Sequence, residues 1–152
     1  MSRPRATVPR RRSREAALQV LYALDLSHRG GGGAADGADS EEAFENAVAH
    51  FELPPAARAF AGELVHGVVA HRDKIDALVA RHATHWRLDR MAAVDRNILR
   101  LAAYETLYTS TPAAVVIDEA VGLARRFGGD ESPGFVNGVL DALAREVRGE
   151  AR

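Results

Sequence analysis

The sequence predicts an all-α protein with seven helices. Apolar residues recur at helical spacing in seven successive segments, and no segment shows the sustained alternation of apolar and polar residues that a half-buried strand needs. Proline, glycine or short polar runs separate these segments, and helices begin and end at such residues. The chain has 152 residues, 47% of them hydrophobic, which is enough for one domain with a substantial core.

The first three helices are expected at about residues 10–28, 40–51 and 54–70. Residues 1–9 contain two prolines and no periodicity, so they are expected to form a flexible basic arm. The apolar stripe of the first helix is formed by Ala17, Leu18, Leu21 and Leu24. A glycine-rich, low-complexity loop follows over residues 29–40. Ser40 can cap the second helix, and Pro54 with Pro55 begins the third.

The other four helices are expected at about residues 72–85, 89–109, 113–127 and 132–147. The helix over 89–109 has the broadest apolar face, which is typical of a central helix. Gly128 and Gly129 suit a helix end that needs a positive φ. Ser132 can accept hydrogen bonds from the first turn of the last helix as its N-cap, with Pro133 at the first helical position. The domain is therefore expected over residues 10–148, with a tail at 149–152.

The net charge of −1 hides a strong asymmetry. Residues 1–14 carry six arginines and no acid, whereas the other residues hold 14 basic and 21 acidic side chains, a net charge of −7. A basic arm on an acidic body indicates an anionic partner, and nucleic acid is the first candidate. The alternative is a solubilising tail. Cysteine is absent and no apolar run approaches the ~18–20 residues that span a bilayer, so a cytoplasmic protein is expected.

One flank of the first helix combines charge, an amide and an aromatic ring. A helical wheel places Arg11, Arg12, Glu15, Gln19 and Tyr22 together there. Arginines can meet phosphates while an amide and a ring meet bases, so this flank is a candidate RNA surface. The alternative is a solvated helix end with Tyr22 at the edge of the core.

Phe135 and Asn137 flank the apolar stripe of the last helix near its start. A large aromatic side chain in that place could stack on a ligand or a base, or it could pack against a neighbouring helix. The residues alone favour packing.

No pattern in the chain indicates catalysis or a cofactor. Glu63 and His66 have the Glu-x-x-His spacing of carboxylate metal sites, but such sites need a second pair that the chain lacks. There is no phosphate-binding Gly-x-x-x-x-Gly-Lys loop and no Gly-x-Ser-x-Gly nucleophile elbow. Charged residues on the fifth predicted helix (Asp95, Arg100 and Glu105) form either internal ion pairs or a partner surface. We expect neither an enzyme nor a metalloprotein.

Three segments resemble the NusB family of bacterial transcription antitermination factors. They are residues 10–22 (RRRSREAALQVLY), 94–105 (VDRNILRLAAYE) and 112–141, the last with the blocks 117–121 (IDEAV) and 135–141 (FVNGVLD). The resemblance implies a seven-helix, two-bundle domain that is not an enzyme. It implies binding of single-stranded boxA RNA together with the small-subunit ribosomal protein NusE. The heterodimer would join an RNA polymerase complex that reads through terminators, notably in ribosomal RNA operons.

The resemblance also assigns roles to individual residues. It implies an RNA surface made of Arg10, Arg11, Arg12, Arg14, Gln19, Glu131, Ser132, Phe135 and Asn137. It implies a NusE contact made of Tyr22, Asp95 and Glu105. Some family members self-associate, so a homodimer of the free protein is also considered.

The chain departs from the family pattern in three places. The glycine-rich loop is of a lineage-specific kind, and Arg3 and Arg5 have no firm match. Pro133 and Gly134 replace more polar or basic residues. NusB-like domains also occur in front of RNA methyltransferases, but with an end at residue 152 we expect no such enzyme. The competing hypothesis is a helical protein-binding adaptor whose basic arm is incidental.

Overall fold

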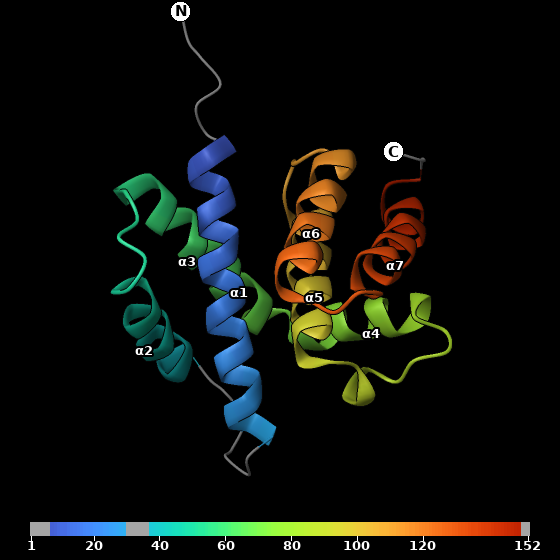
Figure 1. Cartoon of the computed structure of the whole chain (residues 1–152), viewed down its shortest axis with the longest axis horizontal. Helices are drawn as coiled ribbons and strands as arrows, with labels where there is room; N and C mark the ends of the chain where they lie inside the picture. The colour runs from blue at the N-terminus through green and yellow to red at the C-terminus, as the bar shows by residue number, and fades with distance from the viewer. Residues whose placement is uncertain (1–6, 30–36, 150–152) are drawn as a thin grey trace, which may run out of the picture. The chain divides into compact units, whose positions relative to one another are not determined.

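The computed structural model describes residues 7–29 and 37–149, and all regular structure in these ranges is helical (Figure 1). In chain order the elements are α1 (Thr7–Arg29), α2 (Gly37–Val48), α3 (Pro55–Ala70), α4 (Arg72–His82), the 3₁₀ helix η1 (Leu88–Arg90), α5 (Ala93–Tyr108), α6 (Ala113–Phe127) and α7 (Ser132–Arg148). The predicted all-α fold with seven α-helices is thus confirmed. Arg3, Arg5, most of the glycine-rich loop and residues 150–152 lie outside the described residues. Within the described ranges, no helix has both the length and the apolar character that crossing a membrane requires.

Contacts divide the chain into two compact units, residues 1–70 and residues 71–152. In the first unit α1, α2 and α3 pack against one another, as their ribbons in Figure 1 show. The predicted stripe of α1 is buried, and α3 contributes the fully buried Leu64 and Val65. Burying one such side chain contributes about 1.5–3 kcal/mol, so these apolar faces hold the unit together.

In the second unit α5 is the central helix, as expected, and it packs against α4, α6 and α7 (Figure 1). Every residue from Arg96 to Thr106 is buried, so all faces of its middle turns are covered. Apolar side chains supply most of this burial, with Ile98, Leu99 and Ala103 at 0% exposure. The helices around α5 each place an apolar stripe against it, as their periodicity predicted.

The first two helices begin earlier than the sequence predicted. α1 starts at Thr7, so residues 7–9 belong to the helix and not to the arm. Pro9 is tolerated because the first turn of a helix has no intrahelical partner for its N–H groups. α2 starts at Gly37, which places Ser40 inside the helix and not at its cap. α2 also ends at Val48, and Glu52 beyond it has a φ of 50°, a left-handed backbone that no helix continues.

The boundary between the fourth and fifth helices also differs from the prediction. α4 ends at His82, and α5 begins at Ala93 instead of Asp89, with η1 between them. Buried Arg96 explains the break, because its Nη1 donates to the carbonyls of Leu88 (2.9 Å) and Met91 (3.0 Å). A helix through this segment would use the Leu88 and Met91 carbonyls for its own backbone bonds. A side chain from α5 therefore stabilises the interruption.

The C-terminal end of α5 is closed by Arg148 of α7. Its guanidinium donates to the carbonyls of Thr106 (3.1 and 3.2 Å), Thr109 (3.2 Å) and Thr111 (2.7 Å). The last carbonyls of a helix have no intrahelical donor and carry partial negative charge, so a cation there satisfies both needs. Arg148 thus joins the last turns of α5 and α7.

Candidate nucleic-acid interface

The basic flank of α1 lies in the first unit and presents four exposed side chains, Arg11, Arg12, Gln19 and Tyr22. Residues 11, 15, 19 and 22 follow helical spacing, so they line one face of the helix. Tyr22 has 36% of its surface exposed. The structure therefore brings these side chains together, as the wheel predicted. Their contact with RNA stays a prediction.

Arg10 and Arg12 of α1 also contact their own unit. The Arg10 guanidinium carbon lies 4.1 Å from the ring centroid of Phe60, within cation–π range. Arg12 Nη2 donates to the carbonyl of Phe51. Both residues are nevertheless exposed. These contacts restrain the two guanidinium groups, so less conformational entropy is lost when the charges meet a phosphate.

Arg14 does not belong to this surface, and the structure corrects its assignment. Only 4% of Arg14 is exposed, and its guanidinium carbon lies 5.5 Å from the Phe60 centroid. Arg14 stands four and seven residues before Leu18 and Leu21, so it shares their buried face. Next to it, Ser13 Oγ donates to the Ala57 carbonyl at 2.7 Å. This end of α1 is therefore used to pack against α3.

The α6–α7 turn differs from the predicted capping pattern. Ser132 is the first residue of α7, with Glu131 at the N-cap position, and Ser132 Oγ accepts a hydrogen bond from Gly129 N–H at 3.0 Å. Only 6% of Ser132 is exposed. The hydroxyl therefore stabilises the turn. Its burial argues against the predicted assignment of Ser132 to the RNA surface. Glu131 is exposed, and its contact with RNA stays a prediction.

Gly128 is required in this turn for space and not for a positive φ. Its φ is −96°, in the extended region, where any residue is allowed. A Cβ atom on Gly128 would lie 2.6 Å from Ser132 Oγ and 2.8 Å from the Ala124 carbonyl oxygen. Such distances are steric clashes, so the close approach of Ser132 selects glycine.

Phe135 and Asn137, in the first turns of α7, are both partly exposed. The Phe135 ring meets Trp86 edge-on, with 5.7 Å between ring centroids and 63° between ring planes. Trp86 has 57% of its surface exposed and was missed by the sequence reasoning. The one available signal was that Trp86 is the only tryptophan in the chain. Trp86 and Phe135 lie far apart in the sequence, so no local pattern predicted that their rings meet.

The residues predicted to contact a protein partner have different environments. Tyr22 and Asp95 are at least partly exposed. Glu105 is only 2% exposed, so the structure corrects its assignment to a partner surface. Glu105 follows Ile98 and Leu101 at helical spacing and shares their buried face. Arg100 forms an internal ion pair, with Nε and Nη2 at 2.8 and 3.0 Å from the two carboxylate oxygens of Asp76.

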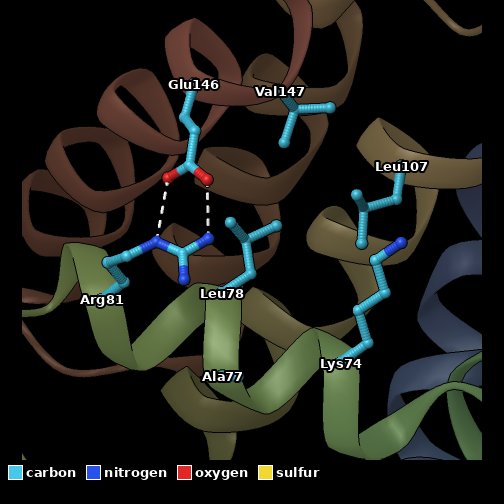
Figure 2. Close-up of a pocket in the computed structure, with 7 residues that line it drawn as sticks. All are labelled: Lys74, Ala77, Leu78, Arg81, Leu107, Glu146 and Val147. Carbon is cyan, nitrogen blue, oxygen red and sulfur yellow. Dashed lines mark hydrogen bonds and ion pairs between the residues drawn. The ribbon is translucent and has the colours of Figure 1, made fainter.

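A separate hollow of about 330 Å³ lies between α4, α5 and α7 (Figure 2). Its lining residues are Lys74, Ala77, Leu78, Arg81, Leu107, Glu146 and Val147. The Arg81 guanidinium donates two hydrogen bonds to the Glu146 carboxylate, at 2.6 and 3.1 Å. His82 Nε2 lies 2.6 Å from the same carboxylate. The hydrogen bond from Arg81, and then that from His82, lowers the pKa of Glu146 to about 2. The carboxylate is therefore ionised and hydrogen-bonded at neutral pH. Such a group is poorly suited to act as a general acid or base.

Among the described residues, no three histidine, aspartate or glutamate side chains gather as metal ligands would. The Glu63 and His66 pair therefore gains no further ligand within these ranges. The candidate surfaces are thus the basic flank of α1 in the first unit and the Phe135–Trp86 pair in the second.

Comparison with known proteins identifies the family. The NusB family model matches residues 11–145. Transcription antitermination protein NusB of Solibacter usitatus is 46% identical over 138 residues, covering 91% of this chain and 90% of that protein. The Bacillus subtilis protein of the same name is 42% identical over 139 residues, covering 91% and 96%.

Solved structures agree with this match. A structure of T. maritima NusB has a TM-score of 0.79 and 34% identity, covering 96% of this chain and 94% of that one. A structure described as antitermination factors NusB and NusE in complex with dsRNA has a TM-score of 0.77 and 30% identity, covering 91% and 97%. The resemblance seen in the sequence is confirmed, and the chain belongs to the NusB family.

Proposed function

We propose that this protein is a transcription antitermination factor that binds boxA RNA together with ribosomal protein NusE. The complex would join RNA polymerase and support read-through of terminators, notably in ribosomal RNA operons. The observation that carries the proposal is the basic flank of α1, where two arginines, an amide and a tyrosine are exposed on one face. That flank belongs to a chain whose relatives include a NusB solved with NusE and RNA.

The chemistry of the flank suits an unpaired RNA strand. Arg11 and Arg12 can neutralise phosphates, which supplies salt-dependent affinity with little sequence preference. Gln19 can hydrogen-bond a base edge, and the Tyr22 ring offers a stacking face at its exposed end. The residues after position 14 carry a net charge of −7, which opposes general coating by RNA. Affinity of the protein alone should be modest, and a basic partner should raise it.

Charge reversal on α1 tests this proposal. The double variant Arg11→Glu, Arg12→Glu should abolish binding of a labelled boxA RNA and leave NusE binding unchanged. The single variant Arg11→Glu should reduce the slope of log affinity against log salt by about 0.7, the value for one lost phosphate contact on a single strand. Fluorescence anisotropy over a salt series measures both effects.

The matched control is Arg145→Glu, which changes the charge by the same amount on an exposed residue of α7. It should leave the salt slope unchanged. If Arg11→Glu and Arg145→Glu weaken RNA binding equally, net charge alone explains the affinity. The helical adaptor is then the better function, and the flank of α1 is not an RNA site.

A further inference from the structure

Trp86 has an unusual environment for the only tryptophan of a folded domain. It lies between α4 and η1 with 57% of its surface exposed. A fully buried tryptophan ring would remove roughly 150–250 Å² from water, so this position leaves much stabilisation unused. The one ring that Trp86 contacts among the described residues is Phe135.

The backbone on both sides of Trp86 is held by hydrogen bonds. Trp86 N–H donates to the Ala83 carbonyl at 2.9 Å, and Ala83 itself is buried. The carbonyl of Arg87 accepts from the N–H groups of Arg90 (3.0 Å) and Met91 (3.1 Å). The Arg87 guanidinium pairs with Asp89 at 3.2 Å. The indole is therefore presented by an ordered turn, and an aromatic group fixed in this way loses little entropy on binding.

We propose that Trp86 and Phe135 form a stacking platform for two unpaired, splayed nucleotides of RNA. The proposal rests on the RNA-binding function given above and adds a residue to it. Nucleobases stack on aromatic side chains, and each such stack contributes substantially to single-strand binding. More than half of the Trp86 surface is exposed, and Phe135 is partly exposed beside it.

The angle between the rings selects the form of RNA. The ring planes are inclined by 63°, so two bases that each lie flat on one ring are inclined by a similar angle. Neighbouring bases in a duplex are nearly parallel and cannot meet both rings at once. Asp130 and Glu131 are exposed in the turn that leads into α7, and their charge repels phosphates there. The platform therefore favours the faces of unpaired bases.

Three substitutions at Trp86 test the platform. Trp86→Leu and Trp86→Ala remove the aromatic face, and Trp86→Phe keeps one. The first two should weaken binding of single-stranded boxA RNA about 5- to 150-fold, the range for losing one base–aromatic stack. Trp86→Phe should retain most of the affinity, and all three variants should bind NusE as the unchanged protein does.

Because Trp86 is the only tryptophan, its emission reports directly on the platform. A stacked base quenches indole fluorescence, so titration with single-stranded boxA RNA should quench it. A duplex of the same sequence should quench it much less. The control is Tyr108→Ala, which removes a 37% exposed aromatic residue. Tyr108 is the last residue of α5, whereas Trp86 precedes the start of that helix. This change should leave RNA affinity and quenching as they were.

The outcomes separate the platform from the function on which it rests. If labelled RNA binds, but the Trp86→Leu and Trp86→Ala proteins bind it equally well and emission is unchanged, the platform is wrong and the antitermination proposal stands. If the Trp86 variants lose NusE and keep RNA, the indole is a protein contact, which also overturns the platform. If the unchanged protein with NusE binds no RNA, both proposals fail.

Discussion

The basic flank of α1 and the interior around α5 use the same charged residue in opposite ways. On α1, Arg11 and Arg12 are exposed, whereas Arg96 and Arg100 of α5 are 2% and 5% exposed. The buried arginines meet backbone carbonyls or a carboxylate, so their charge is used to hold the second unit together. The difference shows that residue type does not assign an arginine to RNA binding. Burial and partners do.

The largest effect is expected from breaking the interior ion pair. Arg100→Leu leaves Asp76 without its bidentate partner and should lower the free energy of unfolding by about 3 kcal/mol. Urea denaturation followed by circular dichroism measures this. The double variant with Asp76→Leu should recover part of the loss, because the carboxylate that lost Arg100 is then removed as well. A change below about 0.5 kcal/mol in the single variant would show that the pair is not structural.

The second prediction concerns the turn before α7. Gly128→Ala places a Cβ against Ser132 and the Ala124 carbonyl, so it should lower the free energy of unfolding by about 1–3 kcal/mol. Gly138→Ala is the matched control, since a Cβ there meets nothing within 4 Å. It should stabilise α7 by about 0.5–1 kcal/mol through helix propensity. Equal effects of the two substitutions would show that the turn has room for a side chain.

The third prediction concerns the two exposed arginines of α1. The variant Arg11→Glu, Arg12→Glu should change the free energy of unfolding by less than about 0.5–1 kcal/mol, because these side chains are at the surface. Denaturation measured beside RNA binding makes the contrast with Arg100→Leu direct. A decrease of about 3 kcal/mol in the free energy of unfolding would show that these arginines are structural, as those of α5 are. The contrast between the two helices would then be wrong.

The smallest effect belongs to the exposed ion pair of Glu146. Its pKa is lowered from 4.5 to about 2 in the folded protein, so the pair stabilises the fold above pH 4.5 and this contribution is lost as the pH falls toward 2. Glu146→Gln should be slightly less stable than the unchanged protein at pH 7 and equally stable near pH 2. Thermal melts across this range measure the difference. A constant gap at all pH values would exclude the carboxylate charge as its cause.

Periodicity predicted the fold well because most helices bury a regular stripe. The bounds of α6 were predicted without error, since Pro112 and Gly128 mark both ends. A break before α5 was predicted, but not its length, because that depends on Arg96 reaching carbonyls in three dimensions. Such a contact leaves no periodic signal in the sequence.

The candidate site was predicted only in part. The exposed flank of α1 follows directly from the helical wheel. Arg14 and Glu105 were misassigned although each shares a face with apolar neighbours, and the burial of that face decides their role. Trp86 was missed because no local pattern relates it to Phe135, 49 positions later in the chain.

The central claim is that this protein binds boxA RNA with NusE. The most direct test is anisotropy with a short boxA RNA and a scrambled RNA of equal length, with and without NusE, over a salt series. The proposal predicts tighter binding of boxA than of the scrambled RNA, further tightening by NusE, and a salt slope that matches several phosphate contacts. Equal, weak binding of both RNAs whatever the partner would contradict it.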